Sequence, residues 1–333
     1  MTRSDRLVDL WMCLVRGAEV VIVNNFRPAP YGGGNQFLCA LRKGILLQGV
    51  SVGVNRSGWR TRSVLFNSYN CEFDWIRALR KRGIRMIHRV DGPISAYRGK
   101  DRDVDERIWN VNRDVADVTV FQSKYSYDKH IEMGLSFVNP VIIPNACDPS
   151  IFYPASVKKC SISNRRLRLI TTCWSDNTMK GGDVYRWLDQ NLDFSRYEYT
   201  FVGRTNEVFK NIKVVSPVAS MPLAEILRSH DIFVMASRND CCSNSLIEAL
   251  ACGLPVVYHS SGGNGELAGR SGLGFMSAEE IPVLLEKIAS GYPGFVEAIH
   301  IASLKEVTDR YLEKMMPDER LQGNRIKGHN LEP

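Results

Sequence analysis

Two acidic residues, Asp240 and Glu248, lie eight positions apart where an apolar strand is expected to lead into a helix. The strand, residues 232–236, is a short run of strand-forming apolar residues typical of a buried parallel sheet. We predict that the helix begins at Ser243 or Asn244, which are good N-caps, and ends before a Gly-x-Pro. Carboxylates placed in this way suit a ligand with phosphates at its centre and hydroxyl groups at both ends, as in a nucleotide sugar.

The predicted helix start supplies groups that bind phosphate. The N–H groups of residues 242–245 point out of the helix start and, together with the helix dipole, form an anion site. Glu248 lies one turn after Asn244 on the same face and can accept hydrogen bonds from a ribose diol. Asp240 precedes the helix and can reach a sugar on the other side of the phosphates. The alternative is an ordinary strand and helix, with Glu248 solvated and Asp240 serving only as a cap.

This stretch resembles the signature of the family 4 glycosyltransferases, which have the GT-B fold. The signature is an acidic residue, seven intervening residues, a glutamate, and a small-residue helix that ends in Gly-x-Pro. Asp240 is in the first acidic position, where Glu is commoner in the family, and Glu248 is in the second. The resemblance covers roughly residues 19–275 and points especially to bacterial enzymes that build surface polysaccharides.

The resemblance implies a glycosyltransferase that moves a hexose-type sugar from a nucleotide-diphosphate sugar to a saccharide or lipid-linked acceptor. It implies retention of anomeric configuration without a metal ion or other cofactor. Asp240 would orient the sugar, while Glu248, Ser243, Asn244 and Ser245 would bind the rest of the donor. Two alternatives stay open: a nucleotide-sugar epimerase of the same architecture, and a catalytically silent nucleotide-sugar-binding subunit.

Lys180 begins a Lys-Gly-Gly run in a loop after a predicted strand. This run resembles the family's Lys-Gly element, in which the lysine holds the donor diphosphate, so the resemblance implies a catalytic role for Lys180. An arginine usually stands six residues earlier in the family, but this chain has Trp174 there. Arg204 and Arg238 are the candidates to replace it.

Three glycines, Gly32, Gly33 and Gly34, follow the first predicted strand. In the resembled family a Gly-Gly loop at this point lies beside donor and acceptor, which implies a donor-binding role for Gly33 and Gly34. A dinucleotide fingerprint would require Gly-x-Gly-x-x-Gly, and its third glycine falls on Phe37. A Rossmann dehydrogenase is therefore disfavoured, and a plain turn is the other interpretation.

Asp91 and His88 end a predicted strand at the edge of the sheet where sites of α/β proteins form. Because related transferases carry an acidic residue or a histidine in the N-terminal half of the cleft, we predict a catalytic role for Asp91. A turn-forming Asp and a buried structural His are the alternatives. Asp101 and Asp103 spell the Asp-x-Asp of metal-dependent transferases, but no apolar strand precedes them, so we expect a solvated loop and no metal.

Strands and helices alternate along the chain, with a proline-rich polar boundary near residues 145–159. The predicted fold is α/β, with two doubly wound Rossmann-like domains facing across a cleft (GT-B). The predicted divisions are residues 1–152 (acceptor side), residues 160–300 (nucleotide-sugar side), and residues 301–333, a helix and tail that could pack back on the N-terminal domain. One long helix is expected over residues 295–316.

The positive charge of the chain is concentrated in its N-terminal half. Residues 1–150 hold 22 Lys and Arg against 15 Asp and Glu, which accounts for the net charge of +7. One explanation is an anionic partner of the basic N-terminal half, such as a membrane surface contacted peripherally or a lipid-linked phosphate acceptor; basic residues 77–85 hold part of this charge, and a solvated helix face is the other explanation. Nucleic acid is not expected, because no recognition motif accompanies the charge. Nine cysteines without a Cys-x-x-Cys pair, and no apolar run of about 20 residues, favour a cytoplasmic protein.

Overall fold

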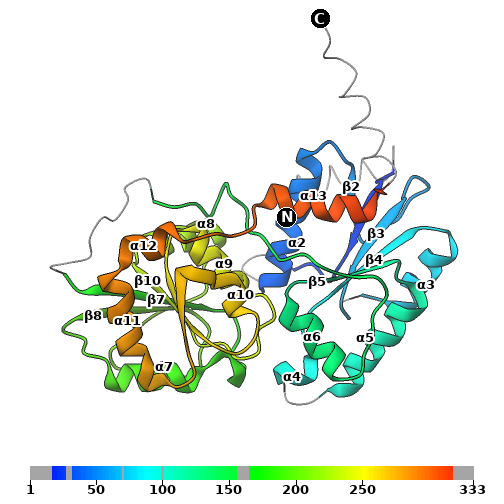
Figure 1. Ribbon diagram of the computed structural model, residues 1–333. Coiled ribbons are helices and arrows are strands. Elements are labelled where there is room, and N and C mark those ends of the chain that lie inside the picture. The colour runs from blue at the N-terminus through cyan, green and yellow to red at the C-terminus, as the bar shows by residue number, and fades with distance from the viewer. Residues whose placement is uncertain (1–16, 28–31, 70, 99–100, 156–164, 318–333) are drawn as a thin grey trace, which may run out of the picture.

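The computed structural model describes residues 17–27, 32–69, 71–98, 101–155 and 165–317. It contains two α/β domains side by side, each built on a six-stranded parallel sheet (Figure 1). The predicted fold class, two Rossmann-like domains, is confirmed. The parts of the predicted N-terminal domain and C-terminal tail that fall in residues 1–16 and 318–333 lie outside the described residues.

The N-terminal sheet has the strand order β2-β1-β3-β4-β5-β6. Its strands are β1 (Val20–Val23), β2 (Val52–Val54), β3 (Ser63–Asn67), β4 (Arg85–Val90), β5 (Val118–Phe121) and β6 (Pro140–Ile142). Its helices are α2 (Gly33–Leu47), α3 (Phe73–Lys81), α4 (Ile94–Arg98), α5 (Arg102–Val115) and α6 (Lys124–Glu132). Alternate residues of a strand point to opposite faces, so Val20 and Ile22 join one core cluster while Val21 and Val23 join another.

The C-terminal sheet has the order β12-β11-β10-β7-β8-β9. Its strands are β7 (Leu167–Cys173), β8 (Tyr197–Gly203), β9 (Lys213–Val215), β10 (Ile232–Met235), β11 (Val256–His259) and β12 (Gly272–Phe275). The helical elements are η1 (Thr178–Lys180), α7 (Gly182–Asn191), α8 (Ser220–Arg228), α9 (Asn244–Ala251), α10 (Asn264–Ala268), η2 (Gly269–Ser271), η3 (Ala278–Glu280), α11 (Ile281–Ser290) and α12 (Tyr292–Glu297). The strand order reverses between β10 and β7, and ligands of open α/β sheets bind beyond the carboxyl ends of strands at such a point.

The prediction of a single helix over residues 295–316 is wrong. The structure has α12 and then α13 (Leu304–Met315), separated by six residues. Tyr292 and Phe295 of α12 pack in the C-terminal core, whereas Val307 and Tyr311 of α13 are fully buried in the N-terminal core. The chain must leave one domain to reach the other, and the helix breaks there (Figure 1).

α13 lies along α2 on the N-terminal domain (Figure 1). The two helices approach closely because Gly44 has no side chain: a Cβ there would lie 2.2 Å from Thr308 Oγ1. Arg85 Nε also donates to the backbone oxygen of Lys314 at 2.6 Å. The last described helix of the chain therefore belongs to the core of the first domain.

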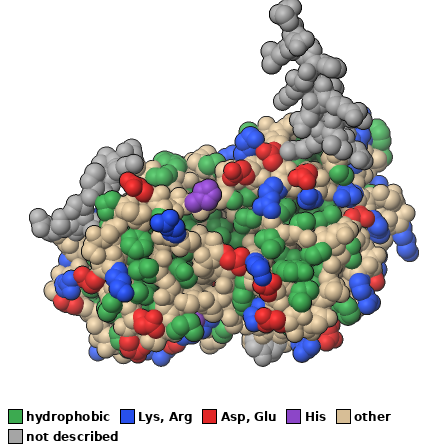
Figure 2. Space-filling view, viewed as in Figure 1, with side chains coloured by type: hydrophobic (Ala, Val, Ile, Leu, Met, Phe, Trp, Pro, Cys, Tyr) green, Lys and Arg blue, Asp and Glu red, His purple; other side chains and the backbone are tan. Residues whose placement is uncertain are grey.

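The basic segment predicted to contact a membrane is largely neutralised within the protein. In α3, Arg77 pairs with two carboxylates and Arg80 pairs with Asp117 at 2.7 Å. Arg82 donates to the loop after β2. Figure 2 shows acidic and basic side chains interspersed over the face in view. Within the described residues no helix combines the length and the apolarity that crossing a membrane requires.

Candidate functional site

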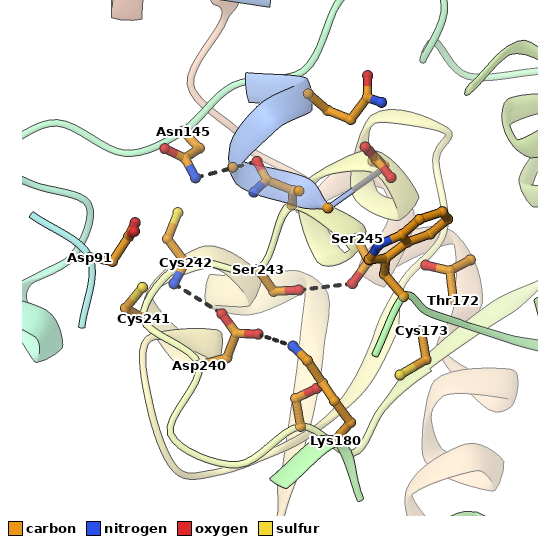
Figure 3. Close-up of a pocket in the computed structure, with 18 of the residues that line it drawn as sticks. Asp91, Asn145, Thr172, Cys173, Lys180, Asp240, Cys241, Cys242, Ser243 and Ser245 are labelled. Atoms are coloured by element: carbon orange, nitrogen blue, oxygen red, sulfur yellow. Dashed lines mark hydrogen bonds and ion pairs between the residues drawn. The ribbon is translucent and has the colours of Figure 1, made fainter. Parts of the chain in front are cut away.

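A cavity of about 390 Å³ lies between the two domains and receives side chains from both (Figure 3). It opens beyond the carboxyl ends of β7 and β10, at the reversal of strand order. All nine residues predicted from the sequence as the site line it: Gly33, Gly34, Asp91, Lys180, Asp240, Ser243, Asn244, Ser245 and Glu248. The tertiary structure therefore brings together segments separated by more than 200 positions in the sequence.

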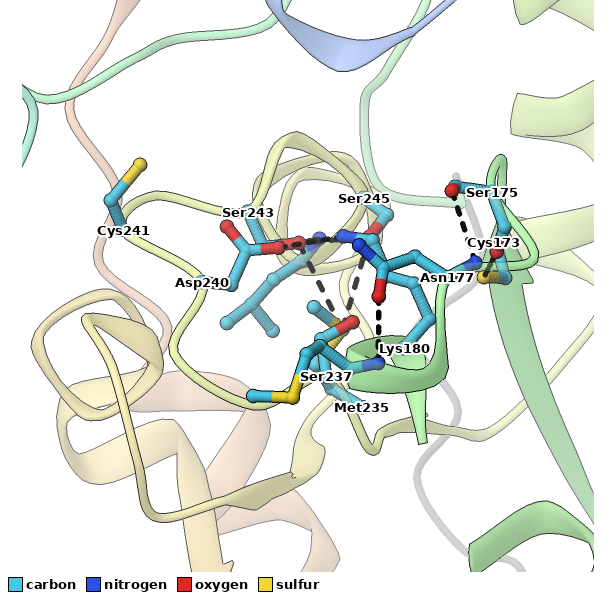
Figure 4. Close-up of polar contacts among 12 residues, drawn as sticks. Cys173, Ser175, Asn177, Lys180, Met235, Ser237, Asp240, Cys241, Ser243 and Ser245 are labelled. Carbon is cyan, nitrogen blue, oxygen red and sulfur yellow. Dashed lines mark hydrogen bonds and ion pairs between the residues drawn. The ribbon is translucent and has the colours of Figure 1, made fainter. Parts of the chain in front are cut away.

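Lys180 and Asp240 form an ion pair in the wall of this cavity (Figures 3 and 4). Lys180 Nζ lies 2.9 Å from Asp240 Oδ2, and both side chains are mostly buried. Burial works against the charge of Lys180, but Asp240 more than compensates, so the pKa of the ammonium group lies above its ordinary value. Lys180 is therefore a fixed positive charge at neutral pH and cannot serve as a proton acceptor.

The turn that carries Lys180 is held by local contacts. Asn177 Oδ1 accepts a hydrogen bond from the backbone of Met179 at 2.9 Å and caps η1 (Figure 4). Gly181 follows with φ of +78°, and a Cβ at that position would lie 2.4 Å from the backbone oxygen of Ala236. This close approach to the end of β10 explains why glycine must follow the lysine.

The start of α9 has the predicted form of an anion site. Ser243 is the N-cap, and its hydroxyl accepts from the backbone of Leu246 at 3.3 Å and contacts the Ser245 hydroxyl at 2.9 Å (Figures 3 and 4). The backbone N–H groups of Asn244 and Ser245 donate to no other described residue. Two backbone donors and the positive end of a helix dipole therefore face the cavity.

Glu248 is buried one turn into α9 and lines the cavity. Its carboxylate forms no hydrogen bond or ion pair with the described residues, and burial raises its pKa from 4.5 to about 8. A buried carboxylate without a partner is costly unless a ligand supplies one. Two hydroxyl groups of a bound sugar would supply it.

The glycine segment of the N-terminal domain meets α9. The structure places Gly33 and Gly34 in the first turn of α2 and not in a loop. A Cβ on Gly33 would lie 2.6 Å from Asn244 Nδ2, so only glycine fits at this contact. Gly34 lines the cavity without such a constraint. Asn145 Nδ2 also donates to Asn244 Oδ1, at 3.3 Å.

Asp91 lies in the N-terminal wall of the cavity, paired with a buried arginine. Arg89 is 1% exposed and its Nη1 lies 2.7 Å from Asp91 Oδ1. Figure 3 shows Asp91 and Lys180 on opposite sides of the Cys241–Cys242 turn. His88, by contrast, is stacked on Phe66 behind the cavity, and burial lowers its pKa to about 3. His88 is therefore a neutral structural histidine.

At the position where the family usually has an arginine, this chain has Trp174, and the side chain of Arg204 stacks on its ring. Trp174 lines the cavity, and the guanidinium of Arg204 lies 4.9 Å from the centre of its ring. Arg238 instead pairs with Asp183 at 2.7 Å. Of the two candidates, Arg204 is the one placed beside Trp174.

Sequence reasoning missed Tyr97, which the N-terminal domain contributes to the cavity beside Lys180. The Tyr97 ring centre lies 5.3 Å from Lys180 Nζ, so the ammonium group is held between a carboxylate and an aromatic face. Asn239 Nδ2 donates to the backbone oxygen of Ala96 at 3.1 Å and fixes α4 there. The five-residue helix α4 has no periodicity long enough to reveal it in the sequence.

Two further glycines, Gly262 and Gly263, pack against the backbone of Asp240. Gly263 N donates to the backbone oxygen of Asp240 at 2.8 Å, and a Cβ on Gly262 would lie 2.5 Å from that oxygen. The Gly-Gly pair after β11 was the sequence signal for this support.

The Asp-x-Asp segment lies away from the cavity. Asp101 precedes α5, and Asp103, in its first turn, pairs with Arg107 at 3.4 Å; the predicted loop is thus a helix start. The described residues contain no group of three or more His, Cys, Asp or Glu side chains that could hold a metal ion.

Comparisons with known proteins identify a glycosyltransferase segment in the C-terminal half of the chain. The family model described as "Glycosyl transferases group 1" matches residues 192–290, the segment that includes β10 and α9. The sequence similarity to group 1 glycosyltransferases is therefore shown for residues 192–290. No curated protein sequence matches the chain.

Solved structures extend the similarity to the whole GT-B fold. Sucrose-phosphate synthase from Thermosynechococcus elongatus is 13% identical, with a TM-score of 0.66 over 93% of this chain and 99% of that one. HepE from Anabaena, in complex with UDP and glucose, is 12% identical, with a TM-score of 0.63 over 93% and 100%. WaaG, a glycosyltransferase involved in lipopolysaccharide biosynthesis, is 14% identical, with a TM-score of 0.62 over 89% and 99%. The predicted resemblance to GT-B glycosyltransferases is confirmed.

Proposed function

We propose that this protein is a retaining, metal-independent family 4 glycosyltransferase that uses a nucleotide-diphosphate sugar. The observation that carries the proposal is the set of groups around one cavity: Lys180 paired with Asp240, the start of α9, and the buried carboxylate of Glu248 one turn into that helix. This arrangement matches the charge pattern of a nucleotide sugar. The UDP bound to HepE supports a uridine nucleotide as the first candidate.

In the proposed reaction, the bond between the sugar C1 and the diphosphate oxygen breaks while a bond from C1 to an acceptor hydroxyl forms on the same face. The acceptor proton passes to the departing diphosphate oxygen. Negative charge builds on the diphosphate, and Lys180 with the N–H groups of Asn244 and Ser245 stabilises it. Asp240 orients the sugar hydroxyls and Glu248 accepts hydrogen bonds from the ribose.

The N-terminal wall is the proposed acceptor side. Asp91 accepts a hydrogen bond from the acceptor hydroxyl and orients it toward C1, while Arg89 holds the Asp91 carboxylate in place at 2.7 Å. The proposed acceptor is a saccharide or a lipid-linked saccharide in the synthesis of a surface polysaccharide. The likeness to WaaG supports this choice.

The test is to incubate the purified protein with labelled nucleotide sugars and a lipid-linked saccharide. A labelled acceptor is the expected product; an isomerised donor would indicate an epimerase, and binding without turnover would indicate a silent subunit. Lys180→Ala is expected to lower kcat by about 10²–10³-fold, because it removes a preorganised charge that stabilises the transition state. Glu248→Ala is expected to raise KM for the donor. Unchanged turnover in both variants would refute the site assignment.

We also propose that this cytoplasmic enzyme makes a peripheral contact with anionic membrane. The proposed contact is the loop after β2 and not α3. The arginines of α3 are paired within the protein, whereas Trp59 is 79% exposed and Arg60 lies over its ring at 4.8 Å. Exposed Trp and Arg side chains are typical of an interfacial anchor. Arg56 is exposed on the same loop.

A further inference from the structure

The first turn of α6, in the N-terminal domain, is capped by a side chain of the C-terminal domain. Glu266, in α10, accepts a hydrogen bond from the backbone of Lys124 at 2.8 Å and from that of Tyr125 at 2.7 Å. Lys124 and Tyr125 are the first two residues of α6. The third N–H, that of Ser126, goes to the helix's own N-cap, Ser123, at 3.0 Å. The cap is thus complete only while the two domains are together.

On the C-terminal side, Glu266 is connected to the donor site by short, buried contacts. Asn264, fully buried at the start of α10, donates to the backbone oxygen of Ser237 at 3.1 Å. Gly263 donates to the backbone oxygen of Asp240. A Cβ on Gly263 would lie 2.3 Å from the backbone oxygen of Cys241 and 3.1 Å from Ser123 Cβ, so glycine permits α10 to approach α6.

On the N-terminal side, the capped turn is connected to the acceptor wall. Ser126 Oγ donates to the backbone oxygen of Asp91 at 3.2 Å. Gln122, just before the turn, lines the cavity and donates to the backbone oxygen of Val90 at 2.7 Å. A displacement of α6 from α10 would therefore move Asp91 away from Asp240. α6 and α10 face each other at the boundary between the lobes (Figure 1).

We propose that Glu266 is a positioning residue that sets the acceptor wall against the donor wall by capping α6 across the domain boundary. A carboxylate at a helix N-terminus is favourable through both its hydrogen bonds and the helix dipole. In an open arrangement of the domains the N–H groups of Lys124 and Tyr125 face water, so the cap favours the closed arrangement. The inference rests on the proposed function, because its catalytic consequence is the alignment of acceptor and donor.

Substitutions at Glu266 test the proposed cap with little risk to folding, because the Glu266 side chain is exposed apart from these contacts. Its bonds go to backbone atoms, and the Lys124 side chain pairs with Asp128 instead, so removing the Glu266 carboxylate leaves the side chains of α6 intact. The variants are Glu266→Ala and Glu266→Gln. The matched control is Glu297→Gln, the same change of charge on an exposed residue of α12 in the C-terminal domain.

The first measurement is hydrogen exchange by mass spectrometry on peptides covering the start of α6. Loss of a helix cap predicts roughly 2- to 30-fold faster exchange in Glu266→Ala, a smaller change in Glu266→Gln, and none in Glu297→Gln. Unchanged exchange in Glu266→Ala would overturn the cap. The exchange measurement needs no ligand, so it tests the cap even if the protein proves to have no glycosyltransferase activity.

The second measurement separates positioning from binding. UDP affinity, measured by calorimetry, is expected to stay within about twofold, since the groups proposed to bind the diphosphate and the ribose, Lys180, the start of α9 and Glu248, are all on the C-terminal domain. Transfer kcat is expected to fall, and hydrolysis of the donor by water is expected to rise relative to transfer, because the acceptor is no longer aligned. Loss of UDP binding with kcat unchanged would overturn the positioning role.

Discussion

Replacing Glu248 by glutamine should stabilise the protein without ligand, by an amount that grows with pH. Glutamine has the same shape but no charge. The folded protein raises the pKa of Glu248 from 4.5 to about 8 through burial, so it binds that proton more tightly than the unfolded chain does. The wild-type protein therefore has the full contribution of this group below a pH of about 4.5 and loses it as the pH rises through about 8.

The structure sets the size of the effect. At about 1.4 kcal/mol per pKa unit, a shift from 4.5 to about 8 corresponds to roughly 5 kcal/mol of unfolding free energy. This is an upper bound, because water that enters the cavity would solvate the carboxylate. We expect the stability difference between Glu248→Gln and wild type to be near zero in acid and to reach a few kcal/mol above a pH of about 8.

The assay is urea-induced unfolding without ligand, followed by circular dichroism over this pH range, with Glu297→Gln as the control for loss of a surface charge. A difference that does not change with pH would refute the account of Glu248 as a desolvated carboxylate. The same account predicts that a nucleotide sugar binds with release of a proton near neutral pH, because its hydroxyl groups favour the ionised form. Calorimetry in buffers of different ionisation enthalpy measures that release.

Two further predictions concern the backbone beside Lys180 and the membrane contact. Gly181→Ala is expected to lower kcat and stability together, because φ of +78° and a Cβ 2.4 Å from a backbone oxygen of the neighbouring strand force the Lys180 turn to shift; unchanged kinetics would contradict the placement of Lys180. Vesicles containing anionic lipid are expected to bind the wild-type protein more tightly at low salt than a Trp59→Ala, Arg60→Ala variant. Vesicle binding that does not depend on anionic lipid, on salt or on these two residues would contradict the membrane proposal.

Local sequence was sufficient to predict most of the elements that carry the site. The β10–α9 unit was predicted almost to the residue, because an apolar strand, an N-cap serine and a terminal glycine are all local signals. Local signals were insufficient where residues of low helix propensity form a helix. Gly33 and Gly34 are poor helix formers and were expected in a loop, yet they form the first turn of α2, where Gly33 packs against Asn244 of the other domain.

Residue types, their spacing and the family resemblance that they carry thus predicted the two α/β domains, the start of the helix after β10 and the nine candidate residues of the site. Only the tertiary structure decided that Lys180 meets Asp240 across 60 positions, and that Tyr97 completes the pair from the other domain. It also divided the last predicted helix between the two cores. Apolar periodicity reports that a face is buried but not which surface buries it. Strand order and domain packing decide that, since they depend on contacts between residues far apart in the chain.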